Sequence, residues 1–274
     1  MSIVAISREL GSGGDAVAAA VAEALHFEYM HRQVILQAAH ALGVPEAEIA
    51  DVAERRLSLW ERLDEEKRRY LIFLEAAYYS FAERGNVVTA GRGGAFFLRD
   101  ISHAVRVRIM APFEVRVRRV MAQEQVDQKA AVARVRTYDR EMAGRIDYLF
   151  GLDWTRPENY DLVLNTKDDA WDFYTDFLVA AAQHPRYQPT PESLQRVKDL
   201  SLAAQVRAAL ATDPGTERLD VEVTAQTGRV LLKAVVFHPA TIETAAEVAK
   251  RVPGVTTVSW EAEEIARVYP GPIM

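Results

Sequence analysis

The 274-residue sequence contains no cysteine. Disulfide bonds, a thiolate nucleophile and cysteine-ligated zinc are therefore excluded. The absence of cysteine fits a reducing compartment. The six histidines are scattered, and no pair shows the spacing of metal ligands. We therefore interpret them as core or surface residues.

Long apolar runs are also missing, since none approaches the roughly 18–20 residues that a membrane span needs. The first residues, MSIVAISRELGSGG, lack the basic region and long apolar stretch of a signal peptide. We therefore expect a cytoplasmic protein with no membrane span. Basic residues are in deficit, with 33 Lys and Arg against 39 Asp and Glu and a net charge of −6. This balance argues against nucleic-acid binding, although a local arginine cluster can still bind anions.

The N-terminus shows a strand, a glycine turn and a helix. Residues 3–6 form a short apolar run, which is typical of a strand buried on both faces. An alanine-rich segment at 15–25 predicts a helix. Between them lies a turn of four small residues, Gly11, Ser12, Gly13 and Gly14. Bare backbone N–H groups at a helix N-terminus can hold phosphate, and the Ser12 hydroxyl adds a donor.

This turn departs from the Walker A pattern. In G-x-x-x-x-G-K-[ST] a lysine follows the second glycine, but here Gly14 occupies that position and Asp15 the next. A tight turn without a ligand is therefore the alternative interpretation.

Strands and helices alternate over the first two thirds of the chain. Further strands are predicted at 86–90, 104–110 and 161–165. Helices are predicted at 31–43, 45–84, from 112 through 119, 128–150 and 168–183. This order predicts an α/β fold, with a mainly parallel sheet and helices on both faces.

The composition changes at 184–191, where three of eight residues are proline, and we interpret this segment as a linker. Beyond it, a helix is predicted at 192–211, a hairpin at 219–236, a helix at 241–252 and a strand at 255–261. The predicted order αββαβ is a small α+β module. We therefore predict domains at 1–183 and 192–266.

Arginines accompany the predicted strand ends. Arg92 lies in a Gly-Arg-Gly-Gly turn directly after a strand, where ligands bind in open α/β sheets. Guanidinium forks suit phosphate oxygens. Arg116, Arg118 and Arg119 lie on a predicted helix that follows another strand, and they are further phosphate-binding candidates. For Arg118 and Arg119, a solvated helix face is the alternative. A charged helix carries three more candidates, Asp139, Arg140 and Arg145.

These motifs together resemble the cytidylate kinase-like family of P-loop proteins over about residues 1–183. The matching segments are Ile6–Gly14, Gly91–Gly94, Tyr138–Arg140 and Tyr160–Thr166. The resemblance implies a nucleoside-monophosphate kinase core. It also implies transfer of the ATP γ-phosphoryl group to CMP or dCMP, with Mg²⁺ bridging the phosphates.

The resemblance also implies roles for the candidate residues. Residues 11–15, ending in Asp15, would bind the ATP phosphates. Arg92 would grip the acceptor monophosphate, with Asp139 beside it. Arg140 and Arg145 would lie in a mobile lid and neutralise the transferring group. We add Arg8, which flanks the turn, as the candidate for the charge that the missing lysine would supply.

Departures from cytidylate kinases leave alternatives open. Gly14 replaces the P-loop lysine, as in members of the wider cytidylate kinase-like family. Gly93 replaces an aspartate that helps to read cytosine, and Met30 or His31 replaces another aspartate. A kinase of another small metabolite and a non-catalytic nucleotide sensor therefore remain alternatives to a CMP kinase.

The C-terminal module, about 194–262, resembles a BON domain. The residues that carry the resemblance are 206–210, the hairpin 221–236 and 248–255 leading into Val258. This resemblance implies binding rather than catalysis, through a protein or lipid partner. A homodimer is a further open alternative.

Overall fold

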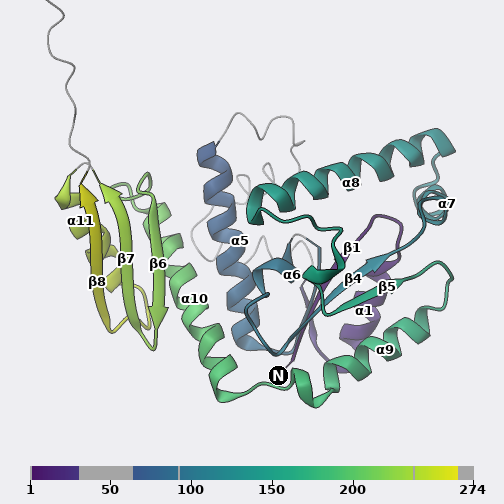
Figure 1. Cartoon of the computed structure of the whole chain (residues 1–274), viewed down its shortest axis with the longest axis horizontal. Helices are drawn as coiled ribbons and strands as arrows, with labels where there is room; N and C mark the ends of the chain where they lie inside the picture. The colour runs from purple at the N-terminus through teal and green to yellow at the C-terminus, as the bar shows by residue number, and fades with distance from the viewer. Residues whose placement is uncertain (1, 31–63, 92, 237, 265–274) are drawn as a thin grey trace, which may run out of the picture.

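The computed structural model describes residues 2–30, 64–91, 93–236 and 238–264 (Figure 1). The predicted helix at 31–43, the first part of the one at 45–84, and Arg92 lie outside the described residues. No helix in the described ranges is long and apolar enough to cross a membrane.

The N-terminal part is built on a five-stranded parallel sheet with the order β2-β3-β1-β4-β5. The strands are β1 (Ile3–Arg8), β2 (Glu28–Met30), β3 (Val87–Ala90), β4 (Ala104–Met110) and β5 (Leu162–Asn165). This sheet confirms the predicted α/β class. Only β2 escaped prediction, because three residues are too few to show an apolar pattern.

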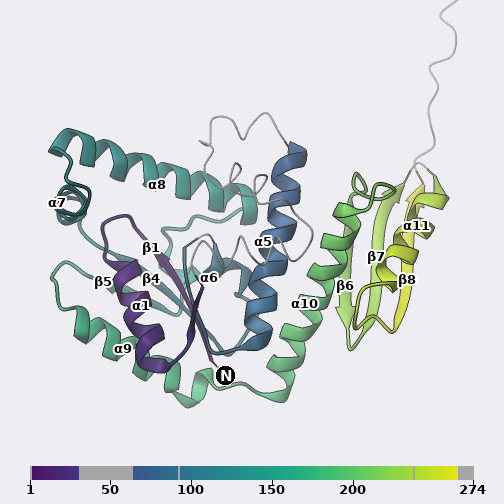
Figure 2. The same cartoon turned by 180° about the vertical axis from the view of Figure 1, so that it is seen from behind.

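Helices cover both faces of this sheet, as Figure 2 shows from behind. Val4 and Ile6 of β1 pack toward α1 (Gly14–Leu25) and α9 (Trp171–Gln183). Ile3 and Ala5 pack on the opposite face. The helices on that side are α5 (Asp64–Arg84), α6 (Gly94–Phe97) and α8 (Gln128–Phe150). Because alternate residues of β1 enter different cores, its first four residues, 3–6, are all apolar.

The remaining elements of this part are α7 (Phe113–Glu124) and the 3₁₀ turns η1 (Pro157–Asn159) and η2 (Pro185–Tyr187). The segment 184–191, predicted as a linker, thus contains η2. It also contains Thr190, whose hydroxyl accepts from the Ser193 N–H in a capping box. Pro191 then begins the next helix, in agreement with the preference of proline for a first helical position.

The C-terminal part has the predicted order αββαβ. Its elements are α10 (Pro191–Thr212), β6 (Val221–Gln226), β7 (Arg229–Val236), α11 (Pro239–Lys250) and β8 (Thr257–Glu264). β6 and β7 are antiparallel, whereas β7 and β8 are parallel. Thr227 (φ 51°) and Gly228 (φ 81°) are both left-handed, as a tight hairpin turn requires.

Helix α10 belongs to both hydrophobic cores. Val197, Ala204 and Ala208 pack in the core that contains α5. Val206 and Leu210 pack in the core of the C-terminal sheet. The division of the chain into domains at 1–183 and 192–266 therefore stays a prediction, since one helix connects the two cores.

His103, which precedes β4, is fully buried, and its Nδ1 lies 2.8 Å from Ser193 Oγ in α10. Its Nε2 has no hydrogen-bond partner among the described residues. Burial disfavours the charged imidazolium and lowers the pKa of His103 below its usual 6.5.

We therefore expect the free energy of unfolding to fall as pH falls below about 6.5. In this range the His103 imidazole binds a proton in the unfolded chain but stays neutral in the folded chain. The loss continues until the pH reaches the lower pKa of the folded state. In His103→Asn the amide does not titrate, so urea unfolding between pH 7 and 5 should show a smaller pH dependence. Exposed His238→Asn is the control. Parallel pH curves for wild type and His103→Asn would contradict the assignment.

Candidate active site

The glycine turn lies between β1 and α1, as predicted. Gly11 (φ 78°) and Gly13 (φ 76°) both adopt left-handed backbone conformations. Gly13 is the N-cap of α1, and no side chain caps this helix. The amides of the first helical turn therefore point out of the helix without a side-chain acceptor, the arrangement that binds anions.

Two neighbouring helices, α7 and α9, approach this turn closely. A Cβ at Gly11 would lie 2.6 Å from the carbonyl oxygen of Arg116 in α7. A Cβ at Gly13 would lie 2.3 Å from the ring of Trp171, the first residue of α9. Both glycines are thus required by close approach as well as by backbone conformation.

Gly11→Ala is expected to destabilise the fold by more than the roughly 1–3 kcal/mol of a strained left-handed residue, because a backbone atom blocks the new methyl group. Gly151→Ala is a matched control, since Gly151 also has a positive φ (61°) but no atom within 4 Å of a Cβ. Urea unfolding measures both variants. Equal losses for the two would contradict the close approach.

The Ser12 side chain is fully buried, and its hydroxyl donates to the Glu9 carbonyl at 2.7 Å. The Ser12 N–H donates to the same oxygen at 3.1 Å. The hydroxyl therefore closes the turn in this structure, and its predicted role as a phosphate donor remains untested.

Arg8, the last residue of β1, extends across the mouth of the turn. Its Nε donates to Asp15 Oδ1 at 2.7 Å, and its Nη1 donates to the hydroxyl of Tyr138 in α8. A Cβ at Gly91 would lie only 3.2 Å from Arg8 Nη1. The guanidinium of Arg8 thus lies between the first glycine turn and the turn that follows β3.

A network of ion pairs, largely buried, adjoins the glycine turn. Glu9 Oε1 accepts from Arg108 at 2.8 Å, and Glu9 Oε2 lies 3.2 Å from Arg116 Nε. Arg116 also binds both carboxylate oxygens of Asp139 at 2.8 Å. Asp139 is therefore held by Arg116 in this structure, and its predicted contact with substrate remains untested.

These ion pairs were not predicted from the sequence, although one arginine in a predicted strand indicated that a partner exists. Arg108 lies on β4 between buried Val107 and Ile109 and is itself buried. A buried arginine needs a carboxylate partner. The sequence does not say which of 39 acidic residues provides it.

Arg118 and Arg119 differ in their surroundings. Arg118 is exposed, which agrees with the solvated-face alternative. Arg119 instead donates to the Thr166 carbonyl at 2.7 Å and to Asp169 at 2.8 Å, and it lies over the Trp171 ring. It thereby fastens the loop after β5 to the glycine turn.

The two predicted lid arginines lie on α8. Arg140 is exposed and contacts Thr137 at 3.5 Å, whereas Arg145 is half-buried. Arg145 lies seven residues after Tyr138, so both occupy the same face of the helix. Burial raises the pKa of Tyr138, and positive Arg8 and Arg145 oppose this rise. Neither Arg140 nor Arg145 forms an ion pair with a described carboxylate.

The second glycine turn follows β3 and surrounds Arg92. Gly91 (φ 79°) and Gly93 (φ 86°) are left-handed, and α6 begins at Gly94. A Cβ at Gly93 would contact Phe150 at 3.3 Å. Since β1 and β3 are neighbouring parallel strands, their carboxyl ends bring both glycine turns to one edge of the sheet.

Comparison with known proteins agrees with this arrangement. The model of the cytidylate kinase-like family matches residues 3–168, which is more than half of the chain. The chain belongs to the cytidylate kinase-like family. Membership supports a nucleotide kinase, that is, a phosphotransferase.

Relatives and solved structures are consistent with the family. A cytidylate kinase of Methanothermobacter thermautotrophicus is 31% identical over 133 residues, covering 46% of this chain and 81% of that protein. One from Methanopyrus kandleri is 27% identical over 173 residues, covering 60% of this chain and 84% of that protein. A crystal structure of an uncharacterised protein from Eubacterium ventriosum has a TM-score of 0.53 at 21% identity, covering 66% of this chain and 98% of that chain. This last likeness shows the fold alone.

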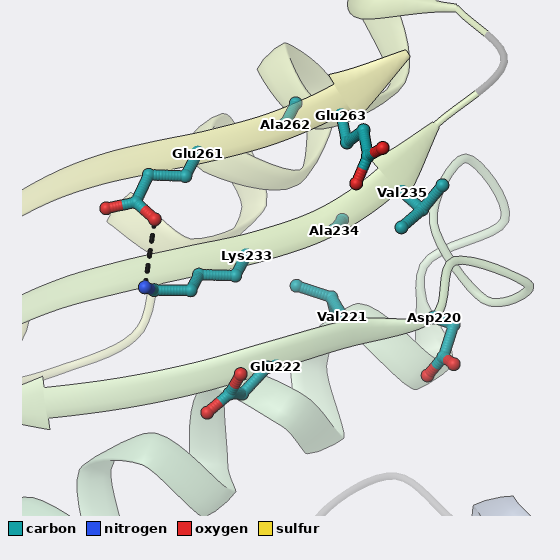
Figure 3. Close-up of a pocket in the computed structure, with 9 residues that line it drawn as sticks. All are labelled: Asp220, Val221, Glu222, Lys233, Ala234, Val235, Glu261, Ala262 and Glu263. Carbon is teal, nitrogen blue, oxygen red and sulfur yellow. Dashed lines mark ion pairs between the residues drawn. The ribbon is translucent and has the colours of Figure 1, made fainter. Parts of the chain in front are cut away.

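The BON domain model matches residues 198–266. The open face of this C-terminal sheet carries a shallow groove of about 590 Å³ (Figure 3). Four carboxylates and one lysine line it, and Lys233 Nζ lies 2.9 Å from Glu261. The groove residues belong to β6, β7, β8 and the residue before β6, so the groove is separate from the glycine turns.

Proposed function

We propose that this protein transfers the γ-phosphoryl group of ATP to a nucleoside monophosphate, with CMP or dCMP as the acceptor. One observation carries the proposal most directly. The guanidinium of Arg8 lies between the turn at residues 11–14 and Gly91, at the adjacent carboxyl ends of β1 and β3. A fixed positive charge therefore stands between the two sites that the reaction requires.

Phosphoryl transfer depends mainly on positioning and on neutralising negative charge. In our proposal the backbone amides of residues 11–14 and the N-terminus of α1 hold the ATP phosphates. Arg8 stabilises charge on the transferring group. It thereby takes the role that the P-loop lysine has in proteins with a Walker A motif. Asp15 and Tyr138 hold the Arg8 side chain in place, so that it needs little reorganisation.

The lid completes the donor side in this proposal. Arg140 and Arg145 would neutralise the transferring group when α8 closes on the nucleotide. Tyr138 contacts Arg8 from the same helix, so a lid movement and the Arg8 side chain are mechanically connected. Arg92 would bind the acceptor phosphate between Gly91 and Gly93.

Magnesium would enter with the nucleotide. Asp15 occupies the position where a Walker A Ser or Thr contacts the metal, and carboxylates are ordinary magnesium ligands. The Asp15 side chain is 63% exposed and its Oδ1 accepts from Arg8, so Oδ2 would be the oxygen that holds the metal. When bound, Mg²⁺ would neutralise negative charge on the donor phosphates.

A nucleotide sensor is the second candidate, favoured by Gly14 in place of the lysine and by α10, which joins the two cores. A coupled ADP-release assay with CMP, dCMP, UMP, AMP and small-molecule acceptors distinguishes the two. Turnover with CMP or dCMP supports the proposed kinase. Calorimetric binding of ATP-magnesium without turnover on any acceptor supports the sensor. Failure of ATP-magnesium to bind removes both.

A further inference from the structure

Helix α5 is hydrogen-bonded to the first residue of the second glycine turn and to the last residue of α6. The Tyr78 hydroxyl donates to the Gly91 carbonyl at 3.0 Å, and the Tyr79 hydroxyl donates to the Phe97 carbonyl at 3.0 Å. Tyr78 is fully buried and stacks on Phe97. The carbonyls of Gly91 and Phe97 thus each accept from one of two consecutive tyrosines, so the positions of Gly91 and of the end of α6 depend on α5.

The same helix packs against α10. Phe73, Ala77 and Phe81 of α5 share a core with Ala204 and Ala208 of α10. Figure 1 shows the two helices side by side between the large sheet and the small one. The C-terminal part therefore borders α5 directly.

A half-buried ion pair lies in this contact. Arg207 Nη2 of α10 lies 2.8 Å from Glu75 Oε1 of α5, with 21% and 24% of the two side chains exposed. Arg207 Nη1 also donates to the Val223 carbonyl of β6 at 3.2 Å. One guanidinium thus joins α5, α10 and the C-terminal sheet.

Arg207 stabilises the ionised form of Glu75. Burial raises the pKa of the Glu75 carboxyl, and the positive charge of Arg207 opposes that rise. Without Arg207, a partly desolvated carboxylate would remain unpaired, which is unfavourable. Glu75 lies three and four residues before Tyr78 and Tyr79, that is, one helical turn away.

A second polar contact joins the same elements. Arg68 of α5 donates to the Leu219 carbonyl, and its Nη2 lies 3.2 Å from Asp220. Asp220 also lines the groove on the open face of the C-terminal sheet (Figure 3). The start of β6 is therefore tied to α5 at two points.

We propose that the C-terminal module positions Gly91, Gly93 and helix α6, which border the proposed acceptor site, through α5, with Arg207 and Glu75 as positioning residues. The consequence for acceptor binding rests on the proposed kinase function, whereas the mechanical connection does not. The path runs from the Val223 carbonyl through Arg207 and Glu75 to Tyr78 and Tyr79.

The test uses the full chain and the variant Arg207→Gln. Hydrogen exchange reports on the turn directly, since the Phe96 and Phe97 N–H groups bond to the Gly93 carbonyl at 2.8 and 3.0 Å. We expect exchange at residues 93–97 to accelerate by about fivefold or more, the range of a typical coupling between sites. The KM for CMP should rise by a similar factor, while the KM for ATP stays within about twofold.

Matched variants make the test specific. Lys233→Gln breaks the ion pair with Glu261 on the open face of the same module and should change neither exchange at 93–97 nor either KM. Arg207→Lys keeps the charge opposite Glu75 and should restore most of the acceptor KM. Glu75→Gln removes the negative partner of the ion pair and should change exchange and the KM for CMP as Arg207→Gln does. If Arg207→Gln does not fold, the result for Glu75→Gln decides the test.

Unchanged exchange at residues 93–97 in both Arg207→Gln and Glu75→Gln would overturn the proposal. Equal acceleration at 93–97 and along β4 would overturn it too, because it would indicate a general loss of stability. If no acceptor is turned over by the wild type, the kinase function fails but the exchange measurement still decides the connection.

Discussion

Arg8→Ala is expected to lower kcat for phosphoryl transfer by about 10²–10³-fold, the usual effect of removing one preorganised donor from a transition state. The reason is the position of its guanidinium between the two glycine turns, where no P-loop lysine assists. ATP affinity should fall less than kcat, because in the proposed mechanism the amides of residues 11–14 hold the phosphates. Steady-state kinetics with CMP and calorimetry with ATP-magnesium measure the two effects.

Two variants accompany Arg8→Ala. Arg8→Lys restores a charge but not the fork that joins Asp15 and Tyr138, so part of the kcat should return. Arg118→Ala removes an exposed arginine of α7 and should leave kcat unchanged. A kcat for Arg8→Ala within threefold of the wild type would show that the missing lysine has another substitute.

Arg92→Ala should abolish acceptor use, with kcat/KM for CMP at least about 100-fold lower, or roughly 3 kcal/mol. Arg92 lies outside the described residues, but in the sequence it follows Gly91 directly after the end of β3. Because the proposed ATP site is the glycine turn after β1, ATP binding should stay nearly intact.

The control for Arg92→Ala is Arg99→Ala. Arg99 is an exposed arginine that follows the same turn, and its ion pair in the described part of the chain is with neighbouring Asp100. It should change neither the KM for CMP nor ATP binding. An unchanged acceptor affinity in Arg92→Ala would place the acceptor site elsewhere.

Local sequence patterns predicted most of the elements well. The strand at 104–110 and the helix at 128–150 agree with β4 and α8 residue for residue. These segments are read from alternation and helical periodicity, which depend only on neighbours along the chain. The glycine turn was equally visible, because left-handed backbone positions need glycine.

Long-range partners could not be predicted. Glu9 pairs with Arg108, and Arg116 pairs with Asp139, across separations of tens of residues. Similarly, Trp171 lies against Gly13 although neither sequence neighbourhood indicates the other. An ion pair or a ring contact leaves no periodic pattern in the sequence. Its two residues therefore cannot be distinguished there from the many other charged and aromatic residues.

Most strands and helices, the glycine turn between β1 and α1, and the family resemblance followed from the residues alone, because each depends on short-range pattern. Only the tertiary structure decided where Arg8 extends, that Arg116 and Asp139 are joined below the turn, and that Arg207 connects the C-terminal sheet to α5. These contacts depend on which surfaces meet when the apolar faces of several elements are buried together, and that choice is made by packing of the whole chain.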